Sequence, residues 1–343
     1  MTPETYLLTD SIEDIQRAAD LLRQGELVAI PTETVYGLAA DATNGEAVRK
    51  IFTAKGRPQD NPLIVHIADL KDWSGLVREI TPLAQKLAEA FWPGPLTLIL
   101  PKADCIPDEV SAGLTTVAVR MPIHPVARQL IRESGLPLAA PSANLSGSPS
   151  PTTAGHVMTD LSGRIAAVVD GGECEVGLES TVVDVSGDVA RLLRPGGITP
   201  DMIRSVLGTV EVDYAVTHQL EQNAKVSSPG MKYKHYAPKA QIKIVRGNAE
   251  DYISLVNRQG VNKQKIVALC FDEDTASLHV PTVSYGSRND AESQAHRLFD
   301  ALRQLDEQGA EIVYAACPSE DGMGLAVYNR LLRAAGFEVI NCD

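Results

Sequence analysis

Apolar residues recur along the first half of the chain in two alternating patterns. Between Ser11 and Glu26 they fall three or four positions apart, as on one face of a helix, and Ser11 can cap the N-terminus. The same spacing predicts helices at 46–54 and 82–91. Short runs rich in apolar and β-branched residues predict strands at 27–31, 63–67, 96–100, 117–120, 138–140, 166–169 and 180–185. Because several strands follow one another without a helix, we expect an α/β domain with a twisted mixed sheet and flanking helices.

The periodicity fades between 208 and 240 and then starts again. Beyond that stretch, strands are predicted at 242–245, 265–270 and 312–316, and helices at 249–256, 291–305 and 328–335. This alternation favours a smaller, doubly wound, Rossmann-like domain with a parallel sheet. We therefore divide the chain into a first domain at 1–210, a linker at 211–240 and a C-terminal domain at 241–343.

The overall charge limits what the chain can bind. Its 343 residues carry a formal net charge of −13, which disfavours general binding to nucleic acid, so an anionic substrate would need a local cluster of cations. The five cysteines are scattered and odd in number, which indicates neither a disulfide framework nor a zinc site. No apolar run is long enough to span a bilayer and no secretory signal is visible, so we expect a cytoplasmic protein without membrane association.

Three common catalytic signatures are missing from the sequence. There is no Gly-x-x-x-x-Gly-Lys-Ser/Thr phosphate loop, no His-Glu-x-x-His zinc motif and no Gly-x-Ser-x-Gly nucleophile elbow. Gly322-Met-Gly324 precedes a predicted helix but lacks the third glycine of a dinucleotide fingerprint. Hydride transfer and acyl-enzyme hydrolysis therefore have no direct support.

Chemically active residue types gather at the ends of the predicted strands. The segment 31–37 places hydroxyls and the Glu33 carboxylate where an apolar strand should finish, which favours a site over a core turn. The segment 55–61 supplies a lysine and an arginine beside a turn, although such residues are also ordinary at the end of a helix. His66 fits a core histidine and a site residue equally well.

Further cations and hydroxyls lie at later strand ends. Arg120 ends a predicted buried strand, and a buried arginine is costly unless it meets a carboxylate, from either the protein or a ligand. The segment 139–150 is a run of small hydroxyl and amide residues that is typical of a surface turn or of a backbone that a ligand approaches closely. The segment 177–180 precedes another strand, and Arg194 follows it. Together these segments indicate one cationic site within an acidic chain.

The ordered motifs of these segments resemble a known family. They read PTETVYG, AKGRPQDNPLIVHI, FWPGPLTLIL, VAVRMPIHPVA, AAPSANLSG, ESTVVD and LRPGGI, followed by SPGMKYKHYAP in the linker. The chain closely resembles the YrdC-like threonylcarbamoyl-AMP synthases, in the long form that carries an extra C-terminal domain. The resemblance is strong over about two-thirds of the chain, and we see no departure from the core motifs.

The resemblance implies a nucleotidyltransferase reaction. L-Threonine and bicarbonate or CO2 give N-carboxythreonine, which attacks the α-phosphate of ATP to form threonylcarbamoyl-AMP and pyrophosphate. A downstream threonylcarbamoyl transferase complex then uses the product to modify adenosine 37 of certain tRNAs, so direct tRNA binding is not required. Mg²⁺ is implied as a nucleotide-bound ion without dedicated protein ligands.

The resemblance also implies roles for individual residues. The residues expected to line the threonine pocket are Thr34, His66, Arg120, Ala140 and Ser180. Those expected to contact ATP are Arg57, Asn61, Thr116, Ser142, Ser150, Arg194 and Tyr236. Lys55 and Arg57 are the expected catalytic cations, and Lys55 is expected beside the phosphates of ATP. Asn144 and Lys50 are expected as supporting members of the site. The basic and aromatic stretch 232–236 is expected to close over the nucleotide as a lid.

Two other functions fit parts of the pattern. Carbamoyl transfer in hydrogenase maturation uses a related domain, but the additional acylphosphatase-like and zinc modules of those proteins are not visible in this sequence. An RNA-binding or regulatory module without catalysis is the second alternative, which the net charge of −13 disfavours. Pyrophosphate release from ATP that depends on threonine and bicarbonate, without tRNA, separates these functions.

Overall fold

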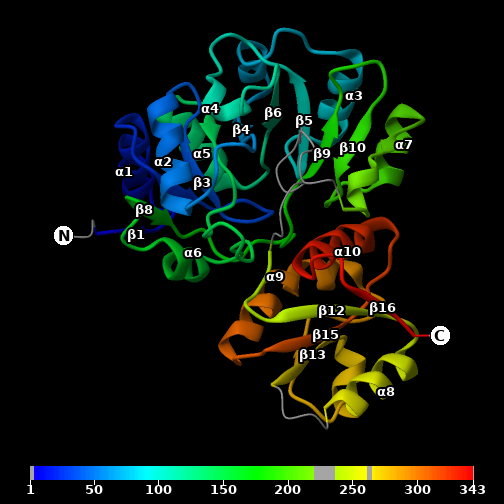
Figure 1. Ribbon diagram of the computed structural model, residues 1–343. Helices are drawn as coiled ribbons and strands as arrows, with labels where there is room; N and C mark the ends of the chain where they lie inside the picture. Colours follow the sequence, from blue (N-terminus) through cyan, green and yellow to red (C-terminus); the bar gives the residue numbers. More distant parts are fainter. Residues whose placement is uncertain (1–3, 220–235, 261–264, 343) are drawn as a thin grey trace. The chain divides into compact units, whose positions relative to one another are not determined.

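The computed structural model describes residues 4–219, 236–260 and 265–342. The described chain forms two compact units (Figure 1). The first contains residues 4–146 and 150–216, and the second contains 147–149, 217–219 and 236–342. Most of the predicted linker, including the proposed lid residues 232–235, lies outside the described residues.

The first unit is built on an eleven-stranded mixed sheet. Its strand order is β1-β8-β2-β3-β7-β4-β6-β5-β9-β10-β11. The strands are β1 (Tyr6–Leu8), β2 (Val28–Ile30), β3 (Gly37–Asp41), β4 (Ile64–His66), β5 (Leu96–Pro101), β6 (Thr116–Arg120), β7 (Leu138–Ala139), β8 (Ala167–Val169), β9 (Thr181–Asp184), β10 (Arg191–Arg194) and β11 (Glu211–Val212). Parallel pairs such as β4–β6 alternate with antiparallel pairs such as β5–β6, so the predicted mixed sheet is confirmed.

Helices cover both faces of this sheet because neighbouring strand residues point to opposite sides. On one side, α1 (Ile12–Arg23) and α5 (Pro125–Ser134) share a core with Val28 and Ile30. On the other, helices α2 (Gly45–Lys55), α3 (Pro82–Phe91), α6 (Ala154–Leu161) and α7 (Pro200–Leu207) share a core with Ala29. The remaining short helices are α4 (Asp108–Ser111), η1 (Leu70–Gly75) and η2 (Tyr214–Val216).

The end of α2 fixes the direction of the segment predicted to carry two cations. Gly56 caps the helix with φ of 63°, in the left-handed region that glycine adopts without strain. The backbone N–H of Arg57 then donates to the Phe52 carbonyl at 2.9 Å. Lys55 is therefore the last helical residue and is buried, whereas Arg57 begins the loop that leads to β4.

The second unit contains a five-stranded parallel sheet in the order β14-β13-β15-β12-β16. Its strands are β12 (Gln241–Arg246), β13 (Ile266–Cys270), β14 (Thr282–Ser284), β15 (Ile312–Ala316) and β16 (Val339–Asn341), and its helices are α8 (Ala249–Gln259), η3 (Asp272–Ser277), α9 (Ala291–Glu307) and α10 (Gly322–Ala334). Helix α8 lies on one face, and α9 and α10 lie on the other (Figure 1). The predicted doubly wound domain is confirmed.

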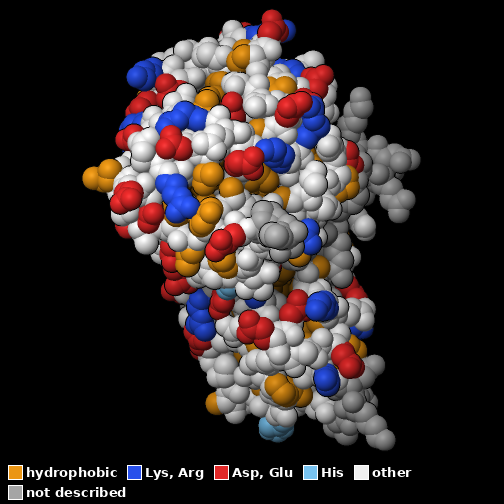
Figure 2. All heavy atoms as spheres, turned by 90° about the vertical axis from the view of Figure 1, so that its left-hand side faces the viewer, with side chains coloured by type: hydrophobic (Ala, Val, Ile, Leu, Met, Phe, Trp, Pro, Cys, Tyr) orange, Lys and Arg blue, Asp and Glu red, His pale blue; other side chains and the backbone are white. Residues whose placement is uncertain are grey.

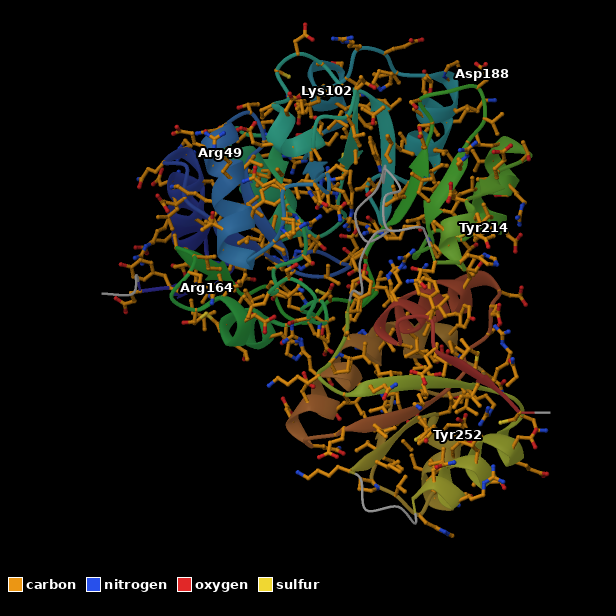
Figure 3. All side chains as sticks on the ribbon, in the orientation of Figure 1. Arg49, Lys102, Arg164, Asp188, Tyr214 and Tyr252 are labelled. Carbon is orange, nitrogen blue, oxygen red and sulfur yellow. The ribbon has the colours of Figure 1, made fainter. Side chains whose placement is uncertain are left out.

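Buried tyrosines join the helices of the second unit to its sheet. The hydroxyl of Tyr252 on α8, which Figure 3 labels, lies 3.1 Å from the carbonyl oxygens of Leu269 and Tyr314. Burial raises the pKa of Tyr252 well above its usual range, so the phenol stays neutral and can donate. The hydroxyl of Tyr285 donates similarly to Ala316, at 2.7 Å.

Several bulk predictions can be compared with the structure. All five cysteines are free, and Cys174 and Cys270 are buried. Among the described residues, no helix is both long and apolar enough to cross a membrane. Lys and Arg side chains are interspersed with Asp and Glu side chains over the visible face of the molecule (Figure 2). This face therefore shows mixed charge rather than a continuous cationic patch (Figure 2).

Candidate active site

Three strand residues bring polar side chains to one face of the first sheet. His66 on β4 is the direct partner of Arg120 on the parallel strand β6. Thr97 on the antiparallel strand β5 is the direct partner of Arg120 on its other side. Because directly paired residues point to the same face of a sheet, the imidazole, the guanidinium and the hydroxyl lie in one row.

Arg120 is buried and held by three acceptors. Its Nη2 donates to Glu33 Oε1 at 2.6 Å, its Nη1 to Thr34 Oγ1 at 2.8 Å, and its Nε to the Gly94 carbonyl at 3.4 Å. The side chains of Arg120 and Glu33 are 4% and 3% exposed. Of the two partners that the sequence left open for this arginine, the protein carboxylate is therefore present.

The loop between β2 and β3 is fixed by its own hydrogen bonds. Thr32 Oγ1 donates to the Val35 carbonyl at 2.7 Å, and the Glu33 carbonyl accepts from the N–H of Val176 at 2.8 Å. Beyond the loop, Leu38 N–H donates to the Pro141 carbonyl at 2.7 Å. Hydrogen bonds therefore hold the backbone of Glu33 and Thr34 in place, and both side chains accept hydrogen bonds from Arg120.

His66 carries no charge in this environment. Burial lowers the pKa of its imidazole to about 3, and the neighbouring Arg120 cation acts in the same direction. Its Nδ1 is buried and has no hydrogen-bond partner among the described residues. The ring can therefore accept or donate a hydrogen bond as a neutral group.

A second polar group adjoins Thr97 at the start of β9. Thr97 Oγ1 and Ser180 Oγ lie 2.8 Å apart, and Arg194 donates from Nε to the Ser180 carbonyl at 3.0 Å and from Nη2 to Ser180 Oγ at 3.2 Å. A Cβ on Gly196 would lie 2.5 Å from the backbone nitrogen of Thr181. Glycine is therefore required for the chain after β10 to approach Ser180.

Lys55 connects α2 to the loop after β7. Its Nζ donates to the carbonyl oxygens of Ser142 and Asn144, the latter at 2.6 Å, and lies 3.4 Å from Asn144 Oδ1. Burial lowers the pKa of Lys55 well below its usual range, and the Arg57 cation acts in the same direction. In the structure Lys55 therefore fixes this loop, and its expected phosphate contact stays a prediction.

The remaining predicted residues occupy several places in the first unit. Arg57 Nη2 donates to the Asn61 carbonyl at 3.4 Å, and Asn61 Oδ1 is buried without a partner among the described residues. The N–H of Ala140 donates to the Ile64 carbonyl at 3.0 Å, and Ser150 Oγ donates to Glu179 Oε1 at 2.5 Å.

Two further residues of the first unit lie away from this row of side chains, and a third predicted residue belongs to the second unit. Thr116 begins β6, four residues and about 13 Å from Arg120 along the strand. Lys50 is exposed and binds Glu26 Oε1 and the Gly25 carbonyl, each at 2.8 Å. Tyr236 belongs to the second unit, where its ring centroid lies 5.2 Å from that of Phe299.

Unpartnered buried acceptors mark the first unit as prepared for a ligand. Among the described residues they include Glu33 Oε2, Asn61 Oδ1, His66 Nδ1 and His124 Nδ1. Native proteins leave few such atoms without a partner, so each of these atoms is a candidate for a hydrogen bond to water or to a ligand. Sequence reasoning assigned no binding role to Glu33, His124 or Thr97, although Thr97 is polar within the apolar strand LTLIL.

Comparison with known proteins identifies the family. Residues 20–196 match a family model, Sua5_yciO_yrdC, described as "Telomere recombination", and residues 198–336 match "Threonylcarbamoyl-AMP synthase, C-terminal domain". A threonylcarbamoyl-AMP synthase of Bacillus subtilis is 50% identical over 335 residues, which cover 97% of this chain and 96% of the relative. One of Pyrococcus abyssi is 45% identical over 333 residues, with 95% of each chain covered.

The chain belongs to the threonylcarbamoyl-AMP synthase family.

A solved structure agrees with this membership. The crystal structure of P. abyssi Sua5 complexed with L-threonine is 42% identical to this chain, with a TM-score of 0.91 and 99% of both chains covered. The predicted family and enzymatic function, formation of threonylcarbamoyl-AMP with ATP as a substrate, are confirmed. Membership of this synthase family disfavours the two alternatives, carbamoyl transfer and an RNA-binding module without catalysis.

Proposed function

We propose that the first unit binds L-threonine beside Arg120 and ATP beside the cations Lys55, Arg57 and Arg194. The observation that carries this proposal is the buried row of His66, Arg120 and Thr97, in which a fixed guanidinium adjoins acceptors without partners. The threonine-bound relative from P. abyssi supports an amino-acid pocket. The pocket would comprise Thr34, His66, Arg120, Ala140 and Ser180.

Arg120 is suited to bind the threonine carboxylate. Within the described residues its hydrogen bonds use one N–H of each Nη nitrogen, so each Nη keeps a second N–H for a ligand. Arginine presents such donors in a planar fork that matches a carboxylate. The neutral imidazole of His66 adds no charge and can bind the threonine hydroxyl.

The ATP residues would act mainly through position and charge. Attack of the N-carboxythreonine carboxylate on the α-phosphate brings negative groups together, so fixed cations lower the barrier without a protein nucleophile. The residues we assign to ATP are Arg57, Asn61, Thr116, Ser142, Ser150, Arg194 and Tyr236. Burial lowers the pKa of Lys55, and the negative charge of an approaching triphosphate would favour its charged form.

The donor set fits a magnesium ion that enters with the nucleotide. Among the described residues, no group of three or more His, Cys, Asp or Glu side chains is arranged to hold a metal ion. The carboxylates of the site are already engaged within the protein, Glu33 by Arg120 and Glu179 by Ser150. Mg²⁺ would therefore be held by phosphate oxygens and water, and its charge would offset that of the triphosphate.

The product leaves this protein for another. We propose that a downstream threonylcarbamoyl transferase complex consumes threonylcarbamoyl-AMP to modify tRNA, and that the synthase itself needs no contact with tRNA. Bicarbonate or CO2 is the proposed source of the carboxyl group. The mixed charges on the visible surface (Figure 2) agree with small-molecule substrates rather than a nucleic-acid face.

The test is release of pyrophosphate from ATP by the full chain without tRNA. We expect release that requires both L-threonine and bicarbonate, and that Arg120→Met abolishes. A matched control is Arg78→Met, because Arg78 is exposed and pairs with Asp104 on the surface at 2.7 Å. Release that persists in Arg120→Met would refute the proposed threonine site.

A further inference from the structure

One acceptor oxygen beside Arg120 has no role in the assignments above. Glu33 is 2% exposed, and its Oε2 has no hydrogen-bond partner among the described residues. Leaving a buried carboxylate oxygen unsatisfied is costly unless a ligand supplies a donor. The atom therefore calls for a hydrogen-bond donor, and a cationic donor suits a carboxylate best.

The position of this carboxylate is fixed before any ligand arrives. Oε1 accepts from Arg120 Nη2 at 2.6 Å, and the Glu33 carbonyl accepts from Val176 N–H at 2.8 Å. Thr34, the next residue, accepts from Nη1 of the same guanidinium at 2.8 Å. Because the side chain is held at both ends, Oε2 is presented in one orientation.

Burial favours the neutral forms of His66, His124 and Cys174 near Glu33. Burial lowers the pKa of His66 to about 3 and holds the pKa of His124 below its usual range. Burial also raises the pKa of the Cys174 thiol to about 12, and the Glu33 charge acts in the same direction. A ligand cation that approaches Oε2 therefore meets the Glu33 carboxylate without repulsion from a protonated histidine.

We propose that Glu33 binds the α-ammonium group of L-threonine through Oε2 while Arg120 binds the α-carboxylate. This inference rests on the threonine pocket proposed above and adds a specificity residue to it. In an α-amino acid the nitrogen and the carboxylate share one carbon, so a single ion pair offers both recognition groups at neighbouring positions. The ammonium group of the zwitterion pairs with the Glu33 carboxylate and its carboxylate pairs with the Arg120 guanidinium, so the net charge of the site stays unchanged.

The assignment has a consequence for the reaction. The nitrogen that Glu33 holds is the one that becomes part of the carbamate in N-carboxythreonine. Glu33 therefore selects for the reacting amine, whereas Thr34, His66 and Ser180 surround the rest of the amino acid. A compound that keeps the carboxylate and hydroxyl of threonine but lacks the amine should lose the contribution of Glu33 alone.

The experiment compares two ligands on two proteins by calorimetry with the full chain. The ligands are L-threonine and the 2,3-dihydroxybutanoate of the same configuration, in which a hydroxyl replaces the amine. For Glu33→Gln we expect threonine affinity to fall about tenfold or more, because a charged partner is lost, and affinity for the analogue to change by less than about threefold. The matched control is Glu109→Gln, which removes a carboxylate that pairs with Arg49 near the surface.

Each other outcome is decisive. Equal losses for both ligands would show that Glu33 acts only by positioning Arg120, and unchanged threonine affinity would show that it does not touch the ligand. If the wild type binds neither ligand, the proposed pocket itself is wrong, which differs from a failure of Glu33→Gln alone.

A measurement on the wild type covers the case in which Glu33→Gln does not fold. The wild type must then bind threonine at least about tenfold more tightly than the dihydroxy analogue, and equal affinities would overturn the inference. A crystal structure of the wild type with threonine should place the ammonium nitrogen about 2.7–3.2 Å from Glu33 Oε2. Ammonium bound only by backbone carbonyls would contradict it.

Discussion

His66 and Arg120 are direct partners across the parallel strands β4 and β6, so a neutral imidazole and a guanidinium share one face of the sheet. The guanidinium lowers the pKa of the imidazole in addition to burial. Glu33, in the loop between β2 and β3, forms an ion pair with Arg120. The predictions below separate what these residues do for folding from what they do for binding.

Removal of Arg120 should destabilise the protein as well as its ligand site. Arg120→Met leaves the Glu33 carboxylate buried without its partner, and loss of one partner from a buried pair costs about 3–5 kcal/mol. The double variant Glu33→Gln with Arg120→Met should recover most of that loss without recovering threonine binding. Urea unfolding of the wild type, the two single variants and the double variant measures the coupling free energy between Glu33 and Arg120. Additive losses of stability would mean that the two side chains act independently.

His66 should make the protein less stable in mild acid. Its folded pKa of about 3 lies below the ordinary value of 6.5, so between these values the unfolded chain binds the extra proton. The contribution is complete above pH 6.5 and diminishes as the pH falls toward 3, by about 1.4 kcal/mol for each unit of difference between the folded and unfolded pKa. His66→Asn should therefore lose less stability than the wild type over this range. The measurement is the free energy of unfolding as a function of pH. Parallel curves for the two proteins would refute the low pKa assigned to His66.

Lys55→Met should reduce catalysis rather than threonine binding. Removal of one fixed cation that stabilises developing charge typically lowers kcat by about 10²–10³-fold. Lys102→Met is the control, because Lys102 pairs with Asp108 at 2.6 Å and has no assigned role in the site. If Lys55→Met raises only the KM for ATP, the lysine serves the loop at Ser142 and Asn144 and does not act on the reacting phosphate.

Gly196→Ala should disrupt the Ser180 and Arg194 cluster. The new Cβ would lie 2.5 Å from a backbone nitrogen and 2.7 Å from the Glu179 carbonyl oxygen, so the backbone must move. We expect a loss of about 1–3 kcal/mol and weaker ATP binding. Gly187→Ala provides the control, since no atom lies within 4 Å of its added Cβ. Similar melting temperatures for the two variants would contradict the close approach.

Tyr236 offers a test of the nucleotide contact proposed for it. Tyr236→Ala should raise the KM for ATP, whereas Tyr236→Phe keeps a ring that can pack on Phe299 and removes only the hydroxyl. A hydroxyl contact with ATP predicts that both variants are impaired, and a stacking contact predicts that only the alanine variant is. Steady-state kinetics that match the wild type in both variants would exclude Tyr236 from the site.

Periodicity predicted the strands that carry β-branched and large apolar residues. The runs at 63–67 and 96–100 correspond closely to β4 and β5, because each strand is buried on both faces and reads as a continuous apolar run. Strand β3, Gly37–Asp41, was not predicted, since glycine and alanine have low strand propensity and its pairing with β2 decides its structure. Strand β1 was missed because it is short and mostly exposed.

The site could be predicted in its residue types but not in its pairings. A buried strand arginine already requires a carboxylate, yet Glu33 and Arg120 are 87 residues apart and meet only through the order of the strands. The family resemblance likewise implies that Lys55 lies beside phosphates, whereas its bonds to the Ser142 and Asn144 carbonyls depend on the path of a loop. The missing hydrogen-bond partner of Glu33 Oε2 could be identified only from the structure, because it depends on which atoms surround the carboxylate.

The order of the strands delays the appearance of the site during synthesis. Strands β9 and β10 are close to the end of the first unit in sequence, yet β9 pairs with β5 beside Arg120. A chain that ends before Ser180 would contain Glu33, His66, Thr97 and Arg120 but would lack the Ser180 hydroxyl and the Arg194 guanidinium that adjoin Thr97. The two polar groups can therefore adjoin each other only after nearly all strands of the first unit have been synthesised.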